Sequence, residues 1–156
     1  RMAVEPEGLN PIGDEELEEV TAAIDSGATY NVMDTKTLSQ RVPIAEGPAF
    51  VRGVQYEVAN GVRIPNLGER KFVGHMEDGV IRSLTVQVCD VNKSLLSVSK
   101  MVKGGNRVVF DDAGSYIEDK VTKEKIWLTE VQGLYTVKMG VKKGGTRDPV
   151  FSRRGY

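Results

Sequence analysis

Apolar and polar residues alternate over short stretches along most of this chain, and turn-forming residues separate the stretches. This pattern is typical of half-buried β-strands, in which successive side chains point to opposite faces. We expect strands at Leu17–Ile24, Thr29–Met33, Phe50–Val58, Val62–Ile64, Leu67–Val73, Val80–Val91, Arg107–Phe110, Ser115–Glu118, Glu124–Leu128 and Leu134–Met139. Many short strands joined by turns predict a mainly β protein, built as a closed barrel or a sandwich.

Helical spacing is confined to two places. Residues 92–102 are compatible with one short helix that ends at the glycine pair 104–105. The apolar positions of this helix are Leu95, Leu96, Val98, Met101 and Val102. Residues 34–38 resemble a single helical turn capped by Asp34. The acidic residues 14–19 could also open a helix, but the small side chains after them favour a strand.

The strongest turn signal is the dipeptide Asn60-Gly61, which joins two strand-like stretches. Pro65 and Gly68 interrupt the second stretch, as expected at a sheet edge or in a protruding hairpin. We therefore expect a hairpin with a flexible tip at residues 59–61. An ordinary surface hairpin has the same pattern.

The chain has 156 residues, enough for one domain with its own core. Its net charge is −1, but residues 1–16 are strongly acidic and residues 142–156 strongly basic. We interpret these two ends as flexible, solvated segments around a folded domain at residues 17–141. The basic tail could instead bind nucleic acid, but its glycine pair 144–145 favours a linker, so nucleic acid is the less favoured partner.

Targeting segments and reactive side chains are scarce. No apolar run approaches the roughly 18 residues of a transmembrane helix, and no leader pattern is visible, so we expect no membrane partner. One cysteine, Cys89, and one histidine, His75, cannot build a disulfide framework, a His-based triad or a His metal cluster. We expect no metal and no cofactor. Cys89 is expected to pack as a small apolar residue, and Trp127 in the core or in a dimer contact.

Asp25 carries the clearest chemical signal. This lone acid follows small and apolar residues and precedes Ser26 and Gly27. A half-buried carboxylate is costly unless it is hydrogen-bonded, paired or protonated. A tight turn could hold it through backbone N–H groups and the Ser26 hydroxyl. An Asx-type turn after a strand explains the same residues without any activity.

The stretch Ile24-Asp25-Ser26-Gly27-Ala28 resembles the catalytic signature of retropepsins, the aspartic proteases of retroviruses and LTR retrotransposons. A second block, residues 95–101, reads Leu-Leu-Ser-Val-Ser-Lys-Met and resembles the Leu-Leu-Ser-Val-Ser-Lys-Leu block of copia-type retrotransposon polyproteins. Further matches lie at residues 58–61, 108–111, 117–120 and 133–135, so the resemblance covers about residues 20–137. Most retropepsins have Gly where this chain has Ser97, and copia-type sequences share the change.

The resemblance implies a retropepsin-like closed β-barrel of the acid-protease fold, with one short helix, that acts as a homodimer. It implies that Asp25 is catalytic and pairs with the Asp25 of a second chain to activate water, as two carboxylates that share one proton do. The residues expected to support this dyad are Ser26, Gly27, Ala28 and Thr29. The residues expected to form the substrate-covering flap are Val58, Ala59, Asn60, Gly61 and Val62. The residues expected to pack behind the catalytic turn, in the ψ-loop, are Leu95, Leu96 and Ser97.

The biological role implied by the resemblance is cleavage of the retrotransposon's own Gag-Pol polyprotein, in the cytoplasm or within virus-like particles. A catalytically silent domain that binds peptides or dimerises is the alternative. A single-chain enzyme with two lobes would need a second acid, and Asp112 is the only candidate. We reject Asp112, because it lacks a neighbouring hydroxyl and lies where a hairpin tip is expected.

Overall fold

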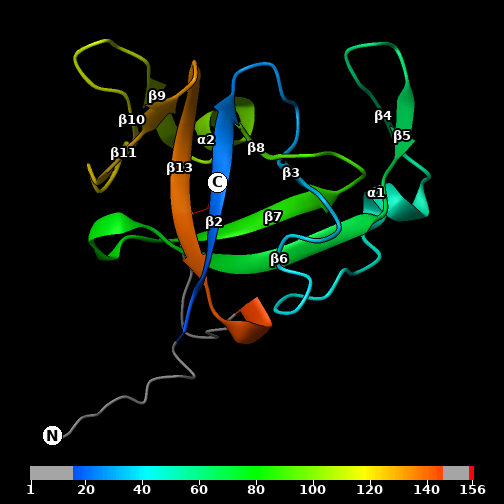
Figure 1. Ribbon diagram of the computed structural model, residues 1–156. Helices are drawn as coiled ribbons and strands as arrows, with labels where there is room; N and C mark the ends of the chain where they lie inside the picture. The colour runs from blue at the N-terminus through cyan, green and yellow to red at the C-terminus, as the bar shows by residue number, and fades with distance from the viewer. Residues whose placement is uncertain (1–15, 146–154) are drawn as a thin grey trace, which may run out of the picture.

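The computed structural model describes residues 16–145 and 155–156, and they form a mainly β fold with 46% strand and 11% helix (Figure 1). The strands are β2 (Glu18–Asp25), β3 (Val32–Met33), β4 (Gln55–Glu57), β5 (Arg63–Pro65), β6 (Gly68–His75), β7 (Ile81–Val88), β8 (Ser94–Ser97), β9 (Asn106–Val109), β10 (Tyr116–Asp119), β11 (Lys125–Trp127), β12 (Thr129–Val131) and β13 (Leu134–Val141). The helices are α1 (Pro48–Val51), α2 (Val98–Lys103) and the 3-10 turns η2 (Glu77–Gly79) and η3 (Lys143–Gly145).

Six strands close into a barrel in the order β13-β2-β8-β3-β7-β6. A single residue pair, Gly140 on β13 with His75 on β6, closes the ring. β12 extends the sheet outside the ring by pairing with the first half of β13. The prediction of a mainly β protein with a closed barrel is therefore confirmed.

The barrel strands follow from the alternation in the sequence. In β7 the residues at every second position, Arg82, Leu84, Val86 and Val88, are buried, as the pattern predicts for a strand with one face inward. β7 pairs with β6 along all eight residues, so the two form a long hairpin across the base of the barrel in Figure 1. The β6–β7 hairpin therefore forms one side of the barrel.

The short strands β3 and β8 lie in the middle of the sheet. β8 runs parallel to β2, and this register sets Asp25 beside Ser97. β3 joins β8 in an antiparallel pair and β7 in a parallel pair. Segments far apart in the sequence are thereby brought together next to Asp25.

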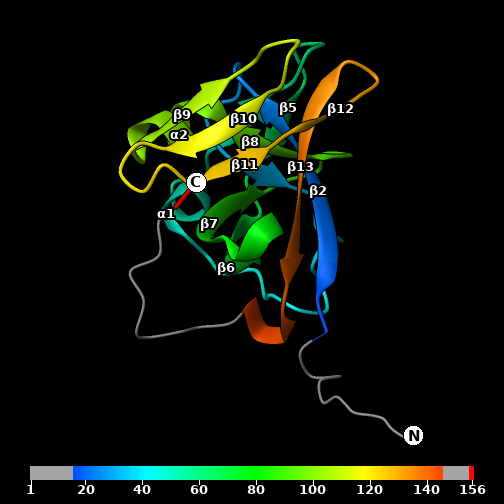
Figure 2. The same cartoon turned by 90° about the vertical axis from the view of Figure 1, so that its left-hand side faces the viewer.

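A second, three-stranded sheet has the order β11-β10-β9, and α2 packs against β9. Figure 2 shows this sheet and α2 together beside the barrel. Ile117 and Ile126 of the small sheet are buried in the same apolar cluster as Ile24 and Leu96 of the barrel. The two sheets therefore share one hydrophobic core. No helix in the described residues is long and apolar enough to cross a membrane.

The helix predictions need correction. Leu95 and Leu96 belong to strand β8, and α2 begins only at Val98, because pairing with β2 takes the preceding residues into the sheet. The expected strand Phe50–Val58 is also wrong at its start. Gly47 and Pro48 open helix α1 there, with Pro48 in the first turn, so the described residues contain two α-helices instead of one.

Smaller differences concern turns and strand lengths. Residues 34–38 form a turn and no helix, although Asp34 Oδ1 accepts hydrogen bonds from the backbone N–H groups of Lys36 and Thr37. The expected strand Thr29–Met33 is reduced to the two residues of β3, and β12 was not expected. The core prediction for Trp127 is wrong, because its side chain is 52% exposed, whereas Cys89 is buried as predicted.

The two ends of the chain fall mostly outside the described residues. This applies to residues 1–15 of the expected acidic segment 1–16, and to residues 146–154 of the expected basic tail 142–156. The last two residues differ from the expected flexible tail. Gly155 forms a β-bridge with Ser83 of β7, and Tyr156 is buried in the core at 8% exposure.

Candidate active site

Asp25 is the last residue of β2 and is half-buried at the start of a tight turn. Its Oδ1 accepts a 2.7 Å hydrogen bond from the backbone N–H of Gly27. A Cβ atom on Gly27 would lie 3.3 Å from that same oxygen, which is closer than most side chains tolerate. The absence of a side chain on Gly27 therefore lets its N–H approach the Asp25 carboxylate, and this hydrogen bond fixes the orientation of the carboxylate.

Ser97 clamps this turn from the neighbouring parallel strand. Its fully buried hydroxyl donates to the carbonyl oxygen of Ala28 at 2.7 Å and accepts from the N–H of Lys100 at 3.1 Å. The same hydroxyl is thus the N-cap of α2 and a brace for the Asp25 turn. A glycine at this position has no hydroxyl and could make neither bond. The serine therefore holds the Asp25 turn with a side-chain hydrogen bond that a glycine would lack.

Asn31 is a supporting residue that the sequence did not reveal. It is 2% exposed, and its Oδ1 accepts from the N–H of Ser97 at 2.8 Å. Its Nδ2 donates to the backbone oxygens of Thr85 and Tyr156, both at 3.2 Å. The amide therefore ties the Asp25 loop to β7, β8 and the end of the described chain. Its only signal in the sequence is a polar residue inside an apolar stretch.

The predicted support residues divide into two groups. Gly27 and Ala28 contact Asp25 or its brace, and Leu96 is buried beneath the site, with Leu95 half-buried. Ser26 and Thr29 are exposed on the turn. Within this one chain their side chains face solvent.

The predicted flap is a hairpin made by β4 and β5. At its tip Val58 N–H donates to Val62 O at 2.9 Å, and Gly61 N–H donates to Val58 O at 2.8 Å. Gly61 has a φ of +82°, which glycine adopts without strain, and Asn60 Oδ1 accepts from Val62 N–H. Ala59 lies exposed between them. Figure 1 shows this tip at the same end of the molecule as the turn after β2.

Two tyrosines connect the hairpin with the Asp25 loop. The rings of Tyr30 and Tyr56 meet edge to face, with centroids 5.9 Å apart. The Tyr56 hydroxyl accepts a 2.8 Å hydrogen bond from Asn66 Nδ2. Burial raises the pKa of Tyr56, although the bond from Asn66 opposes this. The Lys100 ammonium also lies over the Tyr30 ring, 5.4 Å from its centroid.

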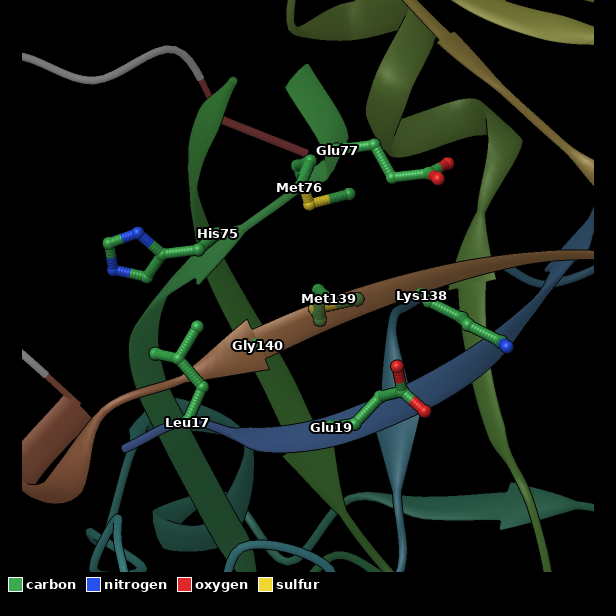
Figure 3. A pocket seen from close by; sticks show the side chains of 8 residues that line it. All are labelled: Leu17, Glu19, His75, Met76, Glu77, Lys138, Met139 and Gly140. Atoms are coloured by element: carbon green, nitrogen blue, oxygen red, sulfur yellow. The ribbon is translucent and has the colours of Figure 1, made fainter. Parts of the chain in front are cut away.

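A separate hollow of about 480 Å³ lies at the far end of β2. Figure 3 shows the Glu19 and Lys138 side chains at the opposite side of the view from the His75 ring, which points away from them. Glu19 and Asp25 lie at opposite ends of β2, so this hollow does not belong to the Asp25 site.

Other chemistry is limited among residues 16–145. No group of three His, Cys, Asp or Glu side chains in this part is arranged to hold a metal ion. Asp112 is exposed in the turn between β9 and β10, which agrees with its assignment as a hairpin tip.

A search against known protein families and a search against curated proteins both returned no match for this sequence.

Proposed function

We propose that this protein is an aspartic endopeptidase of the retropepsin type, whose active site forms when two copies bring their Asp25 carboxylates together. The observation that carries the proposal is the held carboxylate: Gly27 N–H fixes Asp25 Oδ1, and buried Ser97 braces the next carbonyl from the parallel strand. The resemblance of residues 24–28 and 95–101 to copia-type retropepsins points in the same direction.

The proposed chemistry uses the second copy, since one carboxyl group cannot be ionised and protonated at the same time. A twofold axis beside Asp25 would place two carboxyl groups within hydrogen-bond reach. The ionised group takes a proton from water, the water attacks the peptide carbonyl, and the protonated group gives its proton to the leaving amine. The exposed side chains of Ser26 and Thr29 would then face the partner chain.

The substrate would be an extended peptide held between the Asp25 turn and the β4–β5 hairpin. Backbone groups at an exposed hairpin can add a peptide strand, while alternate side chains enter pockets. The contact between Tyr30 and Tyr56 would link movement of the hairpin to the catalytic loop. The biological substrate we propose is a retrotransposon Gag-Pol polyprotein, processed in the cytoplasm or in virus-like particles.

The test compares cleavage of a mixed peptide library by wild type, Asp25→Asn and Asp112→Asn, together with sedimentation mass. We expect dimeric wild type and Asp112→Asn to cleave, and Asp25→Asn to fold but not to cleave. Activity should peak at mildly acidic pH, where one carboxyl of the pair is protonated. Loss of cleavage in Asp112→Asn would overturn the two-chain dyad in favour of Asp112 as the second acid. A stable monomer that never cleaves would overturn the proposal in favour of a silent binding module.

A further inference from the structure

A second cavity, of about 380 Å³, adjoins the candidate active site, and we call it the Lys100 pocket. Five parts of the chain supply its walls, one of them being Tyr156 at the end of the described residues. Tyr30 comes from the Asp25 loop and Arg52 from the end of α1. Gln87 and Glu69 form a polar floor on β7 and β6, and Lys100 closes the pocket from α2. The pocket therefore lies where the Asp25 loop, the base of the hairpin and α2 meet.

The charges in the Lys100 pocket do not cancel. The floor carboxylate already has partners, because Glu69 Oε2 lies 3.6 Å from Lys71 Nζ and its Oε1 accepts from Gln87 Nε2 at 3.5 Å. Arg52 and Lys100 are exposed, and neither takes part in an ion pair of the described residues. Among the described residues, the rim thus presents two positive charges, and Glu69 is the one acidic side chain that lines the pocket.

One hydrogen bond and one strand pairing connect the pocket with Asp25. Asn31 lines the pocket, and its Oδ1 accepts a hydrogen bond from the N–H of Ser97. Ser97 is in turn paired with Asp25 across the adjacent strands β8 and β2. Adjacent strands lie about 4.8 Å apart and an extended chain advances about 3.3 Å per residue. We therefore expect a side chain a few residues from the scissile bond to reach the pocket.

We propose that the Lys100 pocket binds an acidic side chain of the substrate, with its carboxylate between Arg52 and Lys100 and its methylene groups on the Tyr30 ring. Guanidinium and ammonium groups are the natural partners of a carboxylate. The inference rests on the proposed function, because it assigns a residue preference to that peptide substrate. It makes the enzyme selective for peptides with Glu or Asp on one side of the cleavage site.

The test uses a peptide that wild type cleaves and scans Glu against Gln at the third, fourth and fifth residues on each side of the bond. We expect kcat/KM to favour Glu by about fivefold to twentyfold at one position, since two half-exposed ion pairs each contribute a few-fold. The preference should shrink at high ionic strength and below about pH 4, where the substrate carboxyl is protonated. Arg52→Gln with Lys100→Gln should abolish it.

Two matched controls keep the result specific. Lys103→Gln, one turn along α2, and Lys123→Gln, in the turn after β10, each remove one exposed positive charge outside the pocket and should retain the Glu preference. Cleavage without any Glu preference, or a preference that survives the double substitution, would overturn the pocket assignment alone. Absence of cleavage by wild type would overturn the proposed function. In that case calorimetric titration of wild type with short peptides that carry Glu or Gln at one position still decides the pocket.

Discussion

Substitution of Ser97 by alanine is the sharpest test of how the Asp25 turn is held. The change removes one oxygen atom that is fully buried and makes two hydrogen bonds, to Ala28 O and from Lys100 N–H. Loss of an N-cap serine costs about 1 kcal/mol. Leaving the Ala28 carbonyl without its partner costs about 1–3 kcal/mol.

We therefore expect Ser97→Ala to lower the free energy of unfolding by about 2–4 kcal/mol, a large part of the stability of an ordinary domain. Ser97→Gly should lose less from the cap, since glycine is tolerated there within a few tenths of a kcal/mol, but it still leaves Ala28 without its donor. The difference between the two variants therefore measures the N-cap contribution, and the loss that they share measures the hydrogen bond to Ala28.

The assay is urea unfolding followed by circular dichroism, with the slope m compared between variants. Ser99→Ala is the matched control, because it removes a half-exposed hydroxyl from the same helix and should change stability by less than about 0.5 kcal/mol. If Ser97→Ala also costs less than about 0.5 kcal/mol at unchanged m, the hydroxyl does not brace the turn and the reasoning is refuted.

Three further predictions concern buried or hydrogen-bonded groups. Burial raises the pKa of the Cys89 thiol to about 11, so a thiol reagent at neutral pH should label it only in unfolded protein, and fast labelling of the native state would contradict this. Burial alone would raise the pKa of Asp34, but hydrogen bonds from Thr37 and Lys36 outweigh it and lower the pKa, so Asp34 contributes stability above pH 3.8 that disappears as pH falls through its lower folded value. Asp34→Ala should therefore flatten the acid side of the stability curve, and an unchanged curve would contradict it. Burial raises the pKa of Tyr156 to about 12 despite the opposing effect of Arg82. The contribution of Tyr156 to the free energy of unfolding is therefore complete below pH 10 and is lost as pH rises through 12. Tyr156→Ala should cost about 3 kcal/mol in urea unfolding, and a loss below about 1 kcal/mol would show that Tyr156 is not part of the core.

Local signals were sufficient for some parts of the fold. The strand before Asp25 and the Asn60-Gly61 turn were predicted because alternation and a positive-φ glycine act within a few residues. Helix α1 was missed, although Pro48 after Gly47 is a readable helix start. The aromatic and β-branched residues after it suggested a strand instead.

Other parts depend on contacts that a local pattern cannot carry. Leu95 and Leu96 have helical spacing, but β2 draws them into the sheet and buries Leu96 at 2% exposure. Asn31 acts through Ser97 and through Tyr156, which is 125 residues away. The catalytic candidate could thus be found from a motif, whereas its supporting amide required the three-dimensional arrangement.

The closure of the barrel also constrains how the protein is made. Among the described residues, one pair closes the ring, Gly140 with His75, and a Cβ atom on Gly140 would lie 2.7 Å from Leu17 Cδ1. A growing chain therefore cannot complete the ring until β13 has left the ribosome, although the β6–β7 hairpin, whose strands are neighbours in sequence, can form early. Until then the His75 end of β6 is an open edge, while a bridge between Ala45 and Glu69 covers its other end. We therefore expect nascent chains to mispair at the His75 end of β6. A chaperone or a neighbouring nascent chain would act at that end.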